Sequence, residues 1–151
     1  MLHSPVKVLV QRIPGTEDLP LPSYATSGSA GVDLLAAVEE ETVLAPMDRK
    51  LISTGIMAAI PEGFEGQVRP RSGLALRHGI SIVNAPGTID SDYRGEIKVI
   101  MTNLGEEPFV IKRGDRIAQL VICPVVQAAL LEVDELPNTF RGGGGFGHTG
   151  V

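Results

Sequence analysis

The segment RSGLALRHG, residues 71–79, has the residue types of an anion-binding helix start. Ser72 is a good N-cap residue, the leucines and alanine that follow favour a helix, and Gly79 stands where a left-handed residue commonly ends one. Free backbone N–H groups at the start of such a helix, together with Arg71 and the Ser72 hydroxyl, could hold a phosphate. A short connecting helix with solvated arginines explains the same segment, so both interpretations stay open.

The segment NAPGTIDSDYRGEI, residues 84–97, combines extended backbone with a carboxylate. A Pro-Gly pair and an Arg-Gly pair bracket a short stretch before a strong strand, which predicts a hairpin. Extended backbone exposes N–H and C=O groups that can pair with the edge of a nucleobase. Asp90 would lie on the rigid part of the hairpin, where an ionised carboxylate can accept a proton from water. Asp90, like Asp92 or Asp115, could also be an ordinary turn aspartate.

The chain ends in RGGGGFGHTGV, residues 141–151, where four glycines precede a single aromatic ring. Glycine loses the most backbone entropy on ordering, so we do not expect this segment to be fixed without a ligand. Such a tail can lay backbone N–H groups on phosphates and the Phe146 ring on a base. With Arg71, Ser72 and Asp90, it completes a set of groups suited to a phosphate-bearing nucleoside.

Other chemistries find less support in the sequence. The three histidines, His3, His78 and His148, are far apart and show no metal-ligand spacing, which argues against a zinc site. No Gly-x-Ser-x-Gly elbow is present, and no Gly-Lys-Ser/Thr closes a glycine-rich run as a P-loop requires. Residues 142–147 match Gly-x-Gly-x-x-Gly, but no strand leads into them and no helix can follow, so a dinucleotide site does not fit.

One domain of short strands must position these groups. A chain of 151 residues with 43% hydrophobic content can bury one core, and 18 glycines with 11 prolines favour many turns. Several apolar runs alternate with polar residues, as half-buried strands do. The predicted strands are 6–10, 50–52, 56–60, 67–69, 80–83, 96–101, 109–111, 117–122 and 125–133. The pattern predicts an all-β antiparallel sandwich or jelly-roll-like barrel over residues 1–137, with one short helix.

Charge and cysteine content restrict the partners and the compartment. A formal net charge of −5 argues against nucleic acid or an anionic membrane surface as a partner, but it leaves room for a small anion at a local arginine cluster. The lone Cys123 lies in an apolar run, so we expect a small buried hydrophobe and a reducing cytoplasm. Residues 1–20 are interrupted by three prolines, and no long apolar segment follows, which argues against secretion and membrane insertion.

Five segments resemble, in order, the motifs of the homotrimeric dUTPases, which hydrolyse dUTP to dUMP and pyrophosphate. They are AGVDLLA at 30–36, RPRSGLA at 69–75, NAPGTIDSDYRGEI at 84–97, GDRIAQLVI at 114–122 and RGGGGFGHTG at 141–150. Five motifs in one order over nearly the whole chain make the resemblance specific. It implies a jelly-roll-like (β-clip) barrel assembled as a homotrimer, with active sites built at subunit contacts.

The resemblance implies a catalytic and nucleoside-binding role for part of the third motif. Asp90 matches the aspartate that activates the attacking water. Tyr93 matches the tyrosine packed under the deoxyribose, where it leaves no room for a 2′-hydroxyl. Asn84 and the segment Gly87, Thr88 and Ile89 match the stretch that reads uracil.

Phosphate and metal contacts are implied for other motifs. Arg71, Ser72 and Gly73 match the phosphate-binding helix start, and Gln119 matches a glutamine that contacts the phosphates. Asp33 resembles the acid that holds water ligands of Mg²⁺, the metal itself being bound mainly by the triphosphate.

The resemblance also implies a flexible Gly-rich arm at residues 138–151 that closes over a site formed by other chains. Arg141 matches its phosphate contact, Phe146 its base-stacking ring, and Gly147 lies beside that ring. An extended arm of this length spans on the order of 45 Å, enough to reach a neighbouring subunit. His148 departs from the small hydroxyl residue also common at its place in the family.

Two alternatives remain open at the level of sequence. A dCTP deaminase would share the fold, but it needs a glutamate poised for proton transfer at C4 of cytosine, and nothing in the sequence marks Glu96 or another glutamate for that task. A non-catalytic nucleotide-binding module on the same scaffold is the second alternative.

Overall fold

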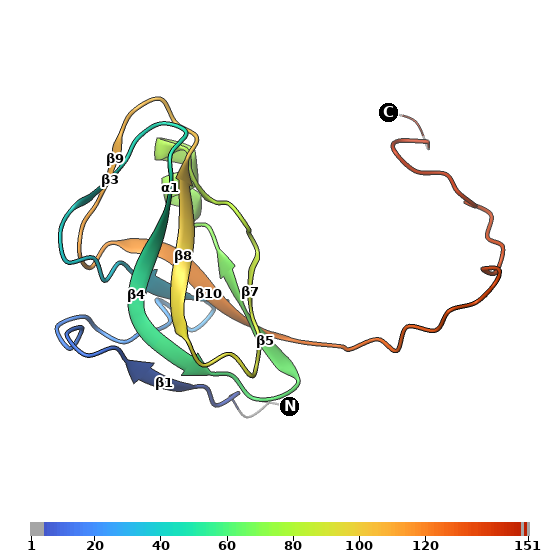
Figure 1. The fold of residues 1–151 in the computed structure, drawn as a ribbon, viewed down its shortest axis with the longest axis horizontal. Coiled ribbons are helices and arrows are strands. Elements are labelled where there is room, and N and C mark those ends of the chain that lie inside the picture. The colour runs from blue at the N-terminus through green and yellow to red at the C-terminus, as the bar shows by residue number, and fades with distance from the viewer. Residues whose placement is uncertain (1–4, 149, 151) are drawn as a thin grey trace.

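The computed structural model describes residues 5–148 and residue 150, and it consists of ten strands and one short helix (Figure 1). In chain order the elements are β1 (Leu9–Arg12), β2 (Val32–Leu35), β3 (Thr42–Leu44), β4 (Arg49–Ala59), β5 (Phe64–Arg69), α1 (Ser72–His78), β6 (Ile80–Ile82), β7 (Gly87–Ile89), β8 (Glu96–Asn103), β9 (Phe109–Ile111) and β10 (Arg116–Pro124). The all-β prediction with one short helix is confirmed. The one described helix has seven residues, too few to span a membrane.

The strands form two four-stranded sheets and a two-stranded ribbon. The first sheet has the order β1-β4-β8-β6, the second β2-β10-β5-β7, and the ribbon joins β3 to β9. All pairings are antiparallel, and many neighbours are far apart in sequence. This is the jelly-roll-like arrangement that the sequence predicted.

Alternation along β8 explains how the sequence EIKVIMTN makes a core strand. Ile97, Val99 and Met101 are fully buried, whereas the residues between them are half-buried or exposed. Leu34 from β2 and Ile117 from β10 belong to the same core. Burying each such side chain stabilises the fold by roughly 1.5–3 kcal/mol relative to exposure. The hydrophobic contact between the sheets therefore holds the scaffold on which the site is built.

Helix α1 begins one residue earlier than expected. Arg71, not Ser72, is the N-cap, with φ −91° and ψ 126°, and it makes no side-chain capping hydrogen bond. The prediction for the other end is confirmed, because Gly79 is left-handed at φ 67° and its N–H donates to the Ala75 carbonyl over 3.0 Å. A Cβ at Gly79 would lie 2.5 Å from the Gly105 backbone nitrogen, so space as well as φ requires glycine.

The predicted hairpin at 84–97 is wrong. Strand β7 pairs with β5 and strand β8 pairs with β4 and β6, so the segment crosses from one sheet to the other. The Tyr93 N–H donates to the Asp90 carbonyl over 3.1 Å and forms the turn between the strands. The local turn signals correctly predicted where the chain reverses. They did not predict the pairing, because β7 and β8 each pair with strands of different sheets rather than with each other.

Strand boundaries changed in several places. The predicted strands 50–52 and 56–60 merge into the single strand β4, which ends at Ala59. Strands β2 and β3 were not predicted, and β7 was expected only as an arm of the hairpin at 84–97. Val125–Val133 was predicted as a strand, but no strand is found there. The chain leaves the barrel after β10 and extends away from it, with Val126 and Leu130 each 93% exposed (Figure 1). Apolar, β-branched residues suit a strand only where a neighbouring strand can pair with them.

The prediction that Cys123 is buried is wrong. It lies on β10 and is half-buried rather than buried, and the Arg69 guanidinium lies 3.8 Å from its sulfur. The side chain is near the end of β10, where the strand leaves the core.

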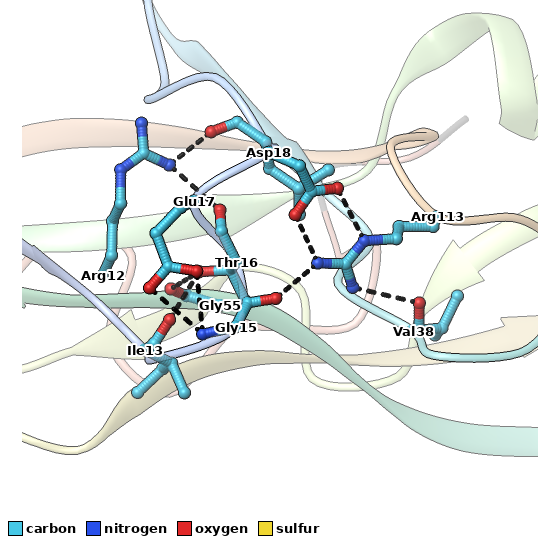
Figure 2. A network of polar contacts seen from close by, with 10 residues as sticks. Arg12, Ile13, Gly15, Thr16, Glu17, Asp18, Val38, Gly55 and Arg113 are labelled. Atoms are coloured by element: carbon cyan, nitrogen blue, oxygen red, sulfur yellow. Dashed lines mark hydrogen bonds and ion pairs between the residues drawn. The ribbon is translucent and has the colours of Figure 1, made fainter.

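An arginine clamp holds the loop between β1 and β2 on the barrel (Figure 2). Arg113 donates two parallel hydrogen bonds to the Asp18 carboxylate, over 2.7 and 2.9 Å, and a third to the Gly15 carbonyl over 2.7 Å. A fourth reaches the Val38 carbonyl over 3.3 Å. Hydrogen bonds from Arg113 lower the pKa of Asp18 below its ordinary value, and those to Asp18 raise the pKa of Arg113.

We predict that Asp18→Asn lowers the melting temperature at pH 7, where the ionised carboxylate binds Arg113. A carboxylate with a lowered folded-state pKa stabilises the protein above its unfolded pKa of about 3.9, and this contribution is lost as the pH falls through the folded-state pKa. The difference between wild type and variant should therefore shrink below about pH 4, and also in about 1 M NaCl. Thermal unfolding over a pH series measures this, with exposed Glu106→Gln as the control. A difference that stayed constant with pH would contradict the role of the charge.

Candidate active site

Three strands of the second sheet bring distant polar residues into one row. Gln119 on β10 is in register with Asp33 on β2 and, on its other side, with Arg69 on β5. The neighbours of Gln119 on β10, Ala118 and Leu120, are buried. Because side chains alternate along a strand, Gln119 faces outward where its neighbours face the core. Antiparallel pairing thus joins residues of the first, second and fourth motifs.

Asp33, Arg71, Arg116 and Gln119 form what we call the arginine cluster. The Nε of Arg71 donates to one oxygen of Asp33 over 3.1 Å, and the Nη1 of Arg116 lies 3.5 Å from the other. Arg71 also donates to the Arg116 carbonyl over 3.3 Å. Two guanidinium groups around one carboxylate leave a formal charge of +1. The cluster can therefore attract an anion while Asp33 holds the arginines in place.

The start of α1 adjoins the arginine cluster through Arg71. Ser72 is the first helical residue, and Gly73 follows it. A Cβ at Gly73 would lie 3.0 Å from an Nη atom of Arg77, so the Arg77 guanidinium folds back over the helix start. Sequence reasoning missed Arg77 and Arg116. The spacing of four between Gly73 and Arg77 on a helix was a signal that could have found the first.

The third motif surrounds a pocket of about 460 Å³. The predicted residues that line this nucleoside pocket, as we call it, are Asn84, Thr88, Ile89, Asp90 and Tyr93; the others are Leu51, Glu96, Lys98 and Ile100. The last four come from β4 and β8, so the pocket lies where the crossing segment meets the first sheet. The sequence did not indicate Leu51, Lys98 or Ile100, because strand pairing brings them to the pocket, and it assigned no role to Glu96 within the third motif.

The edge position of β7 leaves backbone groups for a ligand. Among the described strands, β7 pairs with β5 on one side only, and Gly87, Thr88 and Ile89 are its three residues. A Cβ at Gly87 would lie 3.1 Å from the Asn84 side-chain nitrogen, so glycine lets the Asn84 amide lie close to the strand. An edge strand presents unpaired N–H and C=O groups. The backbone groups expected to pair with a nucleobase therefore belong to an edge strand of a sheet and not to a hairpin.

Asp90 and Tyr93 stand at opposite ends of one turn. Asp90 is exposed, and it lines both the nucleoside pocket and a larger neighbouring groove of about 1040 Å³. None of the salt bridges between described residues involves it. Tyr93 is 43% exposed, and its hydroxyl donates to the Glu96 carbonyl over 2.9 Å. The turn therefore offers one accessible carboxylate and one ring with a fixed hydroxyl.

The predicted groups fall into three separate places within one chain. No hydrogen bond, salt bridge or pocket in the described part of the chain joins the arginine cluster to the nucleoside pocket. The third place is the C-terminal extension, which runs away from the barrel after β10 (Figure 1) and contains Arg141, Phe146 and Gly147 in its sequence. Phe146 is 114% exposed, and the Nε of Arg141 donates to the nearby Gly144 carbonyl over 2.7 Å. A single chain carries the predicted groups without assembling them.

Metal-ligand chemistry is sparse in the described residues. They contain no group of three or more His, Cys, Asp or Glu side chains that could hold a metal ion. His3, one of the three histidines considered above, lies outside the described residues.

Comparison with protein families and curated relatives identifies the motifs. A model of the dUTPase family matches residues 17–150. A deoxyuridine 5'-triphosphate nucleotidohydrolase of Methylocella silvestris is 54% identical over 152 residues, which covers 99% of this chain and 95% of the relative. The enzyme of the same name from Wolbachia pipientis wMel is 55% identical over 152 residues, with 99% of each chain covered.

Solved structures have the same fold. A mutant dUTPase of Staphylococcus bacteriophage 80alpha in complex with dUpNHpp matches with a TM-score of 0.82 at 28% identity, over 96% of this chain and 99% of that one. A mutant dUTPase from phage phi11 of S. aureus, described with a structural Mg(II) ion, has a TM-score of 0.78 at 25% identity, over 87% of this chain and 99% of that one. With a family model spanning most of its length and relatives more than half identical to it, the chain belongs to the dUTPase family.

Proposed function

We propose that this protein hydrolyses dUTP to dUMP and pyrophosphate. The observation that carries the proposal is a nucleoside-sized pocket with an accessible carboxylate, Asp90, on the same chain as a cationic cluster built around Arg71. The chain belongs to a family whose relatives are named for dUTP hydrolysis, and a structural neighbour was solved with dUpNHpp. The reaction would remove dUTP before uracil enters DNA and would supply dUMP for thymidylate synthesis.

The nucleoside would be recognised by backbone and by shape. The free edge of β7 and the Asn84 amide can pair with the donor and acceptor groups of uracil. The Tyr93 ring would lie under the deoxyribose and leave no space for a 2′-hydroxyl. The ring would exclude the 2′-hydroxyl of a ribonucleotide sterically. A 2′-hydroxyl buried there without a hydrogen-bond partner would also weaken binding.

The triphosphate would bind at the arginine cluster and the start of α1. Arg71, Ser72, Gly73 and Gln119 lie on this side, where the cluster is positively charged. The residues fit a hydrated Mg²⁺ that the triphosphate carries, with Asp33 contacting its water ligands, rather than a metal held by the protein alone. When bound, Mg²⁺ neutralises charge on the phosphate oxygens.

Hydrolysis would proceed by attack of water on the α-phosphorus. Asp90 takes a proton from the water, the water oxygen bonds to phosphorus, and the bond from phosphorus to the pyrophosphate oxygen breaks. The arginines stabilise the charge on the departing pyrophosphate. An exposed carboxylate without a salt bridge in the described chain suits this role, because it stays available to accept a proton.

We further infer that complete sites form between subunits of a homotrimer in the cytoplasm. Within one chain, the arginine cluster, the nucleoside pocket and the C-terminal extension are separate, so an oligomer would bring them together. The apolar extension between Val125 and Leu136, with Leu131 83% exposed, offers a surface that a neighbouring subunit could cover. Residues 138–151 would then close the site as an arm that orders on ligand.

A nucleotide panel tests the function directly. We expect dUMP and pyrophosphate from dUTP in the presence of Mg²⁺, with far slower turnover after chelation, and little product from dCTP, dTTP or UTP. Product identification by chromatography separates the alternatives. Ammonia released from dCTP would indicate a deaminase, although the Glu96 carboxylate, which accepts the Gly55 N–H over 3.0 Å and pairs with Lys98, is already engaged. Binding without turnover would indicate a non-catalytic module.

We predict that Asp90→Asn preserves dUTP binding and lowers kcat by a factor of about 100 to 10,000, as expected for loss of a general base. Single-turnover kinetics and equilibrium binding measure the two quantities separately. A kcat equal to that of the wild type would exclude Asp90 as the base.

The same variant tests whether sites are shared between subunits. Arg71→Ala should also be nearly inactive, because the triphosphate loses its cationic contact. If Asp90 and Arg71 meet across a subunit boundary, co-refolding the two variants should yield mixed trimers with some intact sites. The mixture should then exceed the mean activity of its parents. Activity no greater than that mean would place both residues in a site formed by one chain.

We predict that deleting residues 141–151 leaves the fold and the oligomer intact and severely reduces turnover. Among the described residues of this segment, the side-chain hydrogen bonds stay within the extension, so the barrel should not depend on them, whereas the proposed closure over the ligand would be lost. Phe146→Ala should lower kcat/KM by itself. Phe140→Ala is the matched control, since Phe140 is 111% exposed in the same extension. Size-exclusion chromatography with dUTP assays measures both effects, and loss of the oligomer on deletion would mean that the segment is structural.

A further inference from the structure

We infer that Glu96 is a positioning residue, which orients the Tyr93 ring and thereby sets discrimination between deoxyribose and ribose. The inference rests on the proposed function. Glu96 is the first residue of β8 and takes part in two different hydrogen bonds. Its backbone carbonyl accepts the Tyr93 hydroxyl over 2.9 Å, and its carboxylate accepts the Gly55 N–H over 3.0 Å. One residue therefore connects the ring to strand β4, 41 positions away in sequence.

The Tyr93 ring is held closely on the side that faces its own turn. A Cβ at Gly95 would lie 2.4 Å from the Tyr93 hydroxyl oxygen and 2.6 Å from the ring carbon that bears it. Any residue larger than glycine at position 95 would displace the ring. Because Tyr93 is still 43% exposed, its remaining surface is open to a ligand. The Glu96 carbonyl then fixes where the hydroxyl end of the ring points.

A bulge in β4 explains why a side chain is needed at Glu96. The pairing of β4 with β8 shifts between Ser53 and Met57, so four steps along β4 lie opposite two steps along β8. Gly55 lies within this bulge at φ 72°. Its N–H cannot join the regular ladder and instead donates to the Glu96 carboxylate. Lys98 lies 3.4 Å from the second carboxylate oxygen, on the same face of β8.

The bulge itself is anchored from its other side (Figure 2). The Gly55 carbonyl accepts the Ile13 N–H over 2.8 Å and the Thr16 hydroxyl over 3.2 Å. A Cβ at Gly55 would lie 2.7 Å from the Thr16 side chain, so the loop packs directly on the glycine. Arg113 clamps the same loop through Asp18. A continuous series of hydrogen bonds and packing contacts therefore connects the Arg113 clamp, through the loop and Gly55, to Glu96 and the Tyr93 ring.

Two substitutions at position 96 separate the hydrogen bond that the Glu96 carboxylate accepts from the negative charge that it carries. A glutamine at position 96 keeps an oxygen that can accept the Gly55 N–H, whereas a methionine of similar length does not. Glu96→Met should therefore loosen the ring and admit a ribose. We expect the ratio of kcat/KM for dUTP to that for UTP to fall about tenfold, mainly through gain with UTP. Glu96→Gln should retain the ratio, as should the exposed control Glu106→Ala.

A double-mutant comparison tests whether Glu96 acts through the tyrosine. Tyr93→Phe removes the hydroxyl that binds the Glu96 carbonyl and should lower the same ratio. Combined with Glu96→Met, it should cause little further change, because both variants break one connection. Independent, additive losses would overturn the inference. If Glu96→Met fails to fold, as judged by circular dichroism, the ratio for Tyr93→Phe decides, and an unchanged ratio rejects the role.

Ring mobility gives a readout that does not depend on turnover. The chain has no tryptophan and two tyrosines, so Tyr24→Phe leaves Tyr93 as the single tyrosine, whose emission can be excited selectively over that of phenylalanine. In that background, time-resolved anisotropy should show faster ring motion for Glu96→Met than for Glu96→Gln or the parent. Equal ring motion in a folded Glu96→Met variant would refute the inference even if dUTP is hydrolysed. A parent protein that does not hydrolyse dUTP would refute the proposed function, while the anisotropy still decides the positioning role.

Discussion

The alternation of side chains along paired strands is the constraint on which the site depends. Leu120 and Ala118 are drawn into the core by hydrophobic burial, and this fixes Gln119 on the outer face of β10. Pairing with β2 and β5 then sets Asp33 and Arg69 beside it. A shift of one residue in either pairing would turn these polar groups inward and expose the core residues. Core packing and site geometry are therefore specified by the same register.

Division of the functional groups among separate places has a physical consequence. We expect one chain alone to bind a nucleoside triphosphate weakly, because the arginine cluster, the nucleoside pocket and the glycine-rich extension do not meet within it. Assembly and arm closure would concentrate them around the ligand, and ligand contacts would offset the ordering entropy of the glycines. The exposed Phe146 and the apolar run from Val125 to Leu136 are consistent with this arrangement, because both leave hydrophobic surface uncovered in the monomer.

Support for the nucleoside pocket comes from outside the motifs that line it. The loop clamped by Arg113 holds Gly55, and Gly55 holds the Glu96 carboxylate beside Tyr93. A long-range polar network of this kind can tune a pocket without touching the ligand, since it limits the conformations of the residues that do. The glycines at 55 and 95 take part because their missing side chains permit close approach.

Local patterns in the sequence determined which strand faces are buried and where the chain turns, and they indicated candidate residues for the site. The alternation in β8, the left-handed Gly79 and the motif residues Asp33, Arg71 and Asp90 were all predictable, because each depends on a few neighbouring residues or on a recognisable motif. Only the tertiary structure decided which strands pair: β7 and β8 separate into two sheets, Val125–Val133 forms no strand, and Glu96 meets Gly55 at a bulge. The physical reason is that a strand's own residues specify its buried face, whereas its partners are chosen by competition among all available edges and apolar surfaces of the chain.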